Sequence, residues 1–252
     1  MSHIGISQRG HSTLGLILLG AFLAAGVVCS SSIVAAALKE IKLAGQTMTV
    51  KGYAEKKITS DLGIWRGSFA QINVNLANGY SALKLDLEKV LTYLEKQGVK
   101  RSDVEISAVE TSTLYKQTDE GTMTNQIEGY RLSQTVAMRS GDIALVDRLS
   151  RESTDLIQQN IGFQSSPPEY YFTKIDDLKI EMLGEAARDA KERAVKLAES
   201  TGNRVGALRS AQQGVFQITP ENSTSVSDYG ENDTSSIRKS IKAVVTMQFS
   251  IQ

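Results

Sequence analysis

The chain has 252 residues, 41% of them hydrophobic and 22% charged, and its 28 Lys and Arg balance its 28 Asp and Glu. This composition can bury an ordinary core and excludes a chain that is disordered throughout. From Lys39 onward the sequence holds 27 basic and 28 acidic residues. A nearly neutral body argues against a nucleic-acid partner, which usually selects a basic surface. No uniform polybasic run indicates lipid-headgroup binding either.

Cysteine and histidine are absent from the body of the chain. The only cysteine is Cys29, and the only histidines are His3 and His11. The body therefore cannot form an internal disulfide, a Cys/His zinc site or a Ser-His-Asp triad. We expect no metal or cofactor, and we expect that the protein is not an enzyme.

An uncharged, mostly apolar segment runs from Ser12 to Leu38 behind a leader that contains Arg9. A membrane-spanning helix needs about 20 apolar residues and a signal-peptide core about 7–15, so the segment suits a retained anchor or a cleaved signal. We divide the chain into a cytoplasmic leader (1–11), a signal anchor or signal peptide (12–38), a linker (39–46) and a domain (47–252). The flanking charges leave the orientation open.

Alternation and turn residues predict the first half of the domain. Strands are expected at 47–59 and 64–76, joined as a hairpin, and a helix at 81–97 that ends before Gly98. Strands then follow at 104–114 and 130–138, with a polar loop at 116–126.

The second half is predicted to contain two more helices. Asp142 caps a helix that runs to about Asn160, and a short strand follows Pro167 and Pro168. The longest helix begins at Asp176 or Asp177 and ends near Thr201. Its predicted stripe, built mainly of small residues, permits close packing and consists of Ile180, Leu183, Ala187, Ala190, Ala194 and Leu197. Residues 205–218 are extended, 219–236 form a polar loop, and 241–251 form a strand. The order β-β-α-β-β-α-β-α-β-β predicts an α+β body with a mostly antiparallel sheet and three helices on one face.

Several short segments, in this order and spacing, resemble the SIMPL-domain family of bacterial envelope proteins over residues 47–251. The segments are Val50-Lys-Gly-Tyr-Ala-Glu55, Gln97-Gly-Val99, Asp103-Val-Glu-Ile106, Gly129-Tyr130, Ile161-Gly-Phe163, and 186–198 followed by Gly202. Tyr53 stands where the family often has a small residue. The resemblance implies a periplasmic location, a SIMPL-like fold and a non-enzymatic role that is sometimes linked to envelope or oxidative stress. It implies no catalytic residues.

Four candidate sites emerge from the residues. Trp65 and Phe69 could form an exposed interface, because aromatic residues are enriched in interface cores, or they could pack in the core. Asp176, Asp177, Glu181 and Glu185 could bind a divalent cation or act as acids and bases, although an acidic first helical turn explains them as well. Tyr170, Tyr171 and Phe172 could hold a ligand or pack against the sheet. The 219–236 loop could contact a partner.

These observations together predict a protein that works by binding or by homo-oligomeric assembly. We expect a single-pass inner-membrane protein with a periplasmic body, or a protein secreted to the periplasm if the signal is cleaved. The alternatives are a hydrolase or isomerase that uses carboxylates with a lysine or tyrosine, and an adaptor for a protein partner.

Overall fold

The computed structural model describes residues 10–44 and 46–252, and the side chains of 16–38 and 46–252. Residues 1–9 of the predicted leader lie outside this range. The chain divides into two compact units. Unit 1 comprises Met1–Tyr53, Ala186–Gly214 and Val245–Gln252, and unit 2 comprises Ala54–Glu185 and Val215–Val244.

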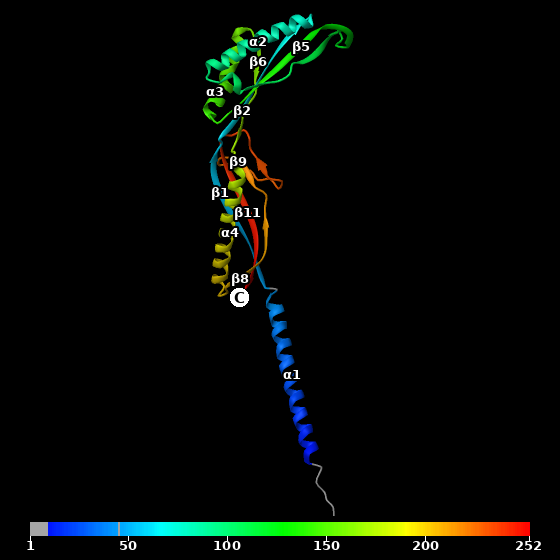
Figure 1. The fold of residues 1–252 in the computed structure, drawn as a ribbon, viewed down its shortest axis with the longest axis vertical. Coiled ribbons are helices and arrows are strands. Elements are labelled where there is room, and N and C mark those ends of the chain that lie inside the picture. The colour runs from blue at the N-terminus through cyan, green and yellow to red at the C-terminus, as the bar shows by residue number, and fades with distance from the viewer. Residues whose placement is uncertain (1–9, 45) are drawn as a thin grey trace, which may run out of the picture. The chain divides into compact units, whose positions relative to one another are not determined.

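Helix α1 (Gly10–Ala44) carries the apolar segment (Figure 1). Its stretch Leu16–Leu38 is long and apolar enough to cross a membrane, and its described side chains are exposed. Ser30, Ser31 and Ser32 donate hydrogen bonds to carbonyls three residues earlier, so their hydroxyls are satisfied within the helix. The predicted linker is mostly helical, because the helix continues to Ala44 through good helix-forming residues.

One antiparallel sheet lies within unit 2. Its strands are β2 (Leu62–Asn73), β3 (Val104–Ile106), β4 (Glu110–Gln117), β5 (Met123–Ser140), β6 (Gly162–Ser165) and β7 (Glu169–Tyr171). β2 and β5 pair along the whole of 63–73 and form its centre. β3 and β4 pair with β5, and β6 and β7 pair with β2.

Helices α2 (Leu76–Lys96) and α3 (Ile143–Glu152) pack against β2 and β5. The predicted apolar stripe of α2 is buried, including Leu83, Val90 and Leu94, and Asp142 caps α3 by accepting the Leu145 N–H at 3.0 Å. Short 3₁₀ helices η1 (Arg101–Asp103) and η2 (Ser153–Gln159) complete this layer. The prediction of helices above an antiparallel sheet is therefore confirmed here.

The predicted hairpin of the first two strands is wrong. β1 (Thr47–Thr59) belongs to a different sheet from β2. At the bend between them, the Ser60 N–H donates to the Ile237 carbonyl and the Asp61 N–H donates to the Tyr171 carbonyl. The bend is thus held by distant segments and does not close a turn on itself.

Other boundaries also differ from the sequence-based expectation. Asn75 caps α2 by accepting the Asn78 N–H at 3.1 Å, so Asn78 and Gly79 lie in the helix and not in a turn. The predicted 104–114 strand is two strands. Most of the predicted 116–126 loop is a hairpin, because β4 and β5 continue toward each other until Gln117 pairs with Met123.

The second sheet contains β1, β8 (Val205–Gln213), β9 (Gln217–Pro220), β10 (Glu231–Asn232) and β11 (Arg238–Ile251). The strand order is β1-β11-β9-β10, and β8 also pairs with β11. β9 and β10 are parallel, whereas the β8–β11 and β9–β11 pairs are antiparallel. The predicted 219–236 loop is therefore interrupted by β10, and the extended 205–218 segment is two strands.

Within unit 1, the C-terminal half of α4 (Ile175–Ser200) lies against β1. Of the predicted stripe, Ala190 and Ala194 are buried, whereas Ile180 and Leu197 are exposed, so the stripe is only partly correct. The buried face of this half of the helix consists of Ala186, Ala190, Ala194 and Ala198. A Cβ on Gly52 would lie 2.6 Å from the Ala190 nitrogen and would overlap the Ala186 carbonyl oxygen. The small residues therefore allow helix and strand to touch, and Val50, Ala194 and Phe249 form the core beside this contact.

Candidate interaction surfaces

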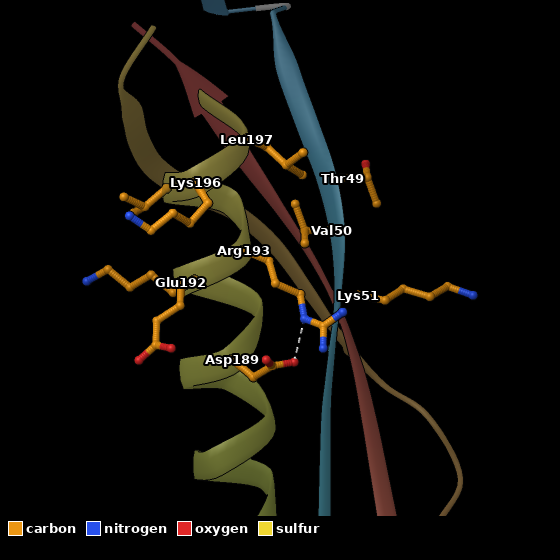
Figure 2. Close-up of a pocket in the computed structure, with 10 residues that line it drawn as sticks. Thr49, Val50, Lys51, Asp189, Glu192, Arg193, Lys196 and Leu197 are labelled. Carbon is orange, nitrogen blue, oxygen red and sulfur yellow. Dashed lines mark hydrogen bonds and ion pairs between the residues drawn. The ribbon is translucent and has the colours of Figure 1, made fainter. Parts of the chain in front are cut away.

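A groove of about 990 Å³ lies in unit 1 between β1 and α4 (Figure 2). Val50, Val195 and Leu197 supply apolar lining. The charged residues that line it are Lys51, Asp189, Lys191, Glu192, Arg193 and Lys196. Positive side chains therefore outnumber negative ones along the groove.

Asp189 joins α4 to the edge of β1. Its carboxylate accepts the Tyr53 N–H at 2.8 Å and the Arg193 Nε–H at 2.8 Å. The hydrogen bond from Arg193, followed by the one from the Tyr53 backbone, lowers the pKa of Asp189 below its ordinary value. The carboxylate satisfies a backbone donor on the open edge of this strand.

Replacing Asp189 with alanine is expected to lower the free energy of unfolding by about 1 kcal/mol at pH 7. Because the pKa is depressed in the folded state, this stabilisation is present above the unfolded pKa and is lost as pH falls through the folded pKa. Urea unfolding of the full chain in detergent should show a smaller difference from wild type at pH 3 than at pH 7. Asp228→Ala, at an exposed position, is the control. An equal loss at both pH values would contradict the ionic role.

In unit 2, the outer edge of β4 is unpaired within the described part of the chain, because β4 pairs only with β5. Beside it, a groove of about 730 Å³ lies between the start of α2 and the β4–β5 strands. Val74, Leu76, Tyr80, Val109, Tyr130 and Leu132 supply its apolar lining. Val74 is 80% exposed, so this apolar surface is open to solvent.

Trp65 and Phe69 do not form an exposed interface. Both are fully buried in the core of unit 2, and the Trp65 Nε1–H donates to Ser165 Oγ at 2.9 Å. The Trp65 and Phe163 rings lie 6.1 Å apart between centroids. The core alternative is correct because α2 and α3 cover this face of β2.

The four carboxylates at the start of α4 do not converge on one point. Glu181 pairs with Lys56 at 2.8 Å and Asp176 with Lys179 at 3.4 Å. The hydrogen bond to Glu181, with the charges of Glu181 and Glu185, raises the pKa of Lys56. Within the described residues, no group of three or more His, Cys, Asp or Glu could hold a metal ion.

Tyr170 and Tyr171 differ in their surroundings. Tyr170 is buried, and its hydroxyl donates to Asp147 Oδ1 at 3.3 Å. Burial, then the nearby Asp147 charge, raises the pKa of Tyr170 to about 12. Tyr171 is half-buried and donates its hydroxyl to Glu169 at 2.9 Å. Packing therefore accounts for Tyr170.

Sequence reasoning missed Lys239, which is only 2% exposed. Its ammonium group donates to the Tyr170 carbonyl at 2.7 Å and to the Asp233 carbonyl, so it ties the 219–236 segment to β7. Burial lowers the pKa of Lys239. The signal was available, because Lys239 shares the alternation of the buried residues Ile241 and Ala243.

The described residues have an α+β fold, and among them one helical stretch, Leu16–Leu38, is long and apolar enough to cross a membrane. The SIMPL family model, "Protein of unknown function (DUF541)", matches residues 48–249, so the chain belongs to this family. No curated protein matches the chain.

Proposed function

We propose that this protein is a non-enzymatic, membrane-tethered envelope protein that works by assembling with further copies of itself. Helix α1 serves as a retained anchor and the SIMPL domain lies on the periplasmic side. The unpaired edge of β4 beside an exposed apolar groove is the observation that carries the proposal.

The β4 edge is suited to pairing with a second copy. An open strand edge presents unpaired backbone N–H and C=O groups. The sequence of β4, ETSTLYKQ, contains no proline that would remove a backbone donor. By contrast, the opposite side of the sheet is partly occupied, because the Tyr170 N–H on β7 donates to the Thr234 carbonyl. β4 is thus the more available edge of this sheet.

Charge supports a twofold, antiparallel arrangement. In such a dimer each contact occurs twice, with the partners exchanged. Centring the pairing on Thr113 places Glu110 of one copy opposite Lys116 of the other at both ends of the strand pair. Opposite charges directly across an antiparallel pair are favourable, and like charges are unfavourable.

Charge reversal at these two positions tests the dimer. Glu110→Lys or Lys116→Glu alone is expected to weaken self-association about tenfold or more, since attraction becomes repulsion in two symmetric pairs. Combining both substitutions should restore association. The measurement is sedimentation equilibrium of the full chain in density-matched detergent.

Glu95→Lys, at an exposed position on α2, is the control and should leave association unchanged. A wild-type chain that remains monomeric at about 100 μM, a typical range for weak complexes, would remove the assembly proposal. If neither Glu110→Lys nor Lys116→Glu weakened association, the interface would lie on another surface.

A further inference from the structure

The two units carry opposite net charges, although residues 39–252 together are nearly neutral. From Lys39 onward, unit 1 holds nine Lys and Arg against four Asp and Glu, a net charge of +5. Unit 2 holds eighteen against twenty-four, a net charge of −6. No basic run is visible in the sequence, because the basic residues of unit 1 come from separate segments of the chain.

The positive unit is also the unit that contains α1. The apolar span ends at Leu38, and helix continues to Ala44. Six helical residues and the two residues before β1, whatever the conformation of those two, span at most about 16 Å, so the start of β1 is within roughly that distance of the end of the span. If α1 is inserted, the end of unit 1 that contains Gln46 is held near the headgroup level.

Arg204 lies at the end of unit 1 where the chain arrives from α1. The Ile251 N–H donates to the Gln46 carbonyl at 3.0 Å, and the Arg204 and Gln252 backbones exchange hydrogen bonds of 2.7 and 2.8 Å. These bonds place Arg204 beside the final residues of β11, which in turn adjoin Gln46. Arg204, one of the basic residues of unit 1, therefore lies near the point where the chain leaves α1.

Most cations of unit 1 are not neutralised by the protein. Arg193 pairs with Asp189 at 2.8 Å and Lys196 with Glu199 at 3.5 Å. Five exposed cations form no ion pair with any residue that the structure describes: Lys51, Arg188, Lys191, Arg204 and Arg209. Lys51 and Lys191 also line the groove between β1 and α4, and Figure 2 labels Lys51.

We propose that unit 1 binds the anionic phospholipid headgroups of the membrane that α1 enters; this inference rests on the proposed membrane anchoring. Lys and Arg side chains attract anionic lipid surfaces, each strengthening the attraction roughly fivefold close to the bilayer. The attraction decays within a Debye length of about 8–10 Å, so only a unit held near the surface experiences it. The connection to α1, at most about 16 Å long, makes the end of unit 1 that contains Gln46 the part nearest to this range. Unit 2 carries the opposite charge and has no such attraction.

Lysine acetylation rates, read by mass spectrometry, test this contact. The full chain is reconstituted in phosphatidylcholine nanodiscs, with or without about 30% phosphatidylglycerol as the anionic component. At low salt we expect phosphatidylglycerol to slow acetylation of Lys51 and Lys191 at least about threefold, and high salt to remove the effect. Lys100 and Lys174, exposed residues of unit 2, are internal controls whose rates should not change.

Arg188→Glu, Arg204→Glu and Arg209→Glu, combined in one variant, should abolish the protection, whereas Lys100→Glu should not. Absence of protection by phosphatidylglycerol, or protection that salt does not reverse, would overturn the headgroup contact. Alkaline carbonate extraction of membranes separates the two proposals. Release of the chain would overturn both the anchor and the headgroup contact, while retention without lysine protection would overturn the headgroup contact alone.

Discussion

Replacing Gly52 with alanine is expected to destabilise unit 1 by at least about 3 kcal/mol, at the upper end of overpacking effects. The new methyl group would overlap the Ala186 carbonyl oxygen and lie 2.6 Å from the Ala190 nitrogen. Both atoms belong to the backbone of α4, so no side chain can rotate away. Relief requires the helix to move off β1, which would open the core around Val50, Ala194 and Phe249.

Hydrogen exchange of the full chain in detergent measures this effect, with loss of protection expected over the C-terminal half of α4. Gly184→Ala is the matched control, because a Cβ there meets nothing within 4 Å. In an exposed helical position that change should stabilise by about 0.5–1 kcal/mol. If Gly52→Ala retained wild-type protection in α4, the close approach of helix and strand would be contradicted.

Replacing Trp65 with alanine is expected to cost about 3–5 kcal/mol of unfolding free energy, because it empties a large, fully buried site. It also leaves Ser165 Oγ without its donor, although Ser165 still donates to the Ser150 carbonyl at 2.8 Å. Urea unfolding followed by far-UV circular dichroism should show the loss. Trp65→Phe should recover part of it by filling most of the volume.

Tyr229→Ala is the control for removal of an aromatic ring, since Tyr229 is 97% exposed. We expect it to change stability by less than about 0.5 kcal/mol. If Trp65→Ala reduced self-association while leaving stability intact, Trp65 would be an interface residue and the core assignment would be wrong.

The face of β2 illustrates what alternation in a sequence can and cannot predict. Alternation separates Ile64, Ile72 and Val74 from Trp65 and Phe69, and it gives no absolute direction. Ile72 and Val74 prove to be exposed, whereas Trp65 and Phe69 are buried. The missing information was in the glycines of the Trp65 face, since Gly63 faces Val146 of α3 and Gly67 faces the Phe163 ring. Glycines on a strand face leave room for another element.

Helices were more predictable than strand partners. The stripe of α2 and the Asp142 cap depend on residues within a few turns, so local patterns contain them, whereas the stripe predicted for α4 is only partly buried. The pairing of β1 with β11 depends on residues at opposite ends of the domain. Local patterns carry little information on such pairing, which is why a hairpin was predicted instead. The unit 1 cations were likewise separated in the sequence and joined only by the fold.

The pairing of β1 with β11 also sets an order of events during synthesis. About 180 residues separate the two strands in the chain, which corresponds to about 10–40 s at ribosomal rates of about 5–20 residues per second. Throughout this interval β1 has emerged without a strand partner, since among the described strands it pairs only with β11. Unit 1 is therefore the last part of the domain to form, although it contains the first strand. Until β11 is made, the unpaired edges of β1 are open to pairing with another chain.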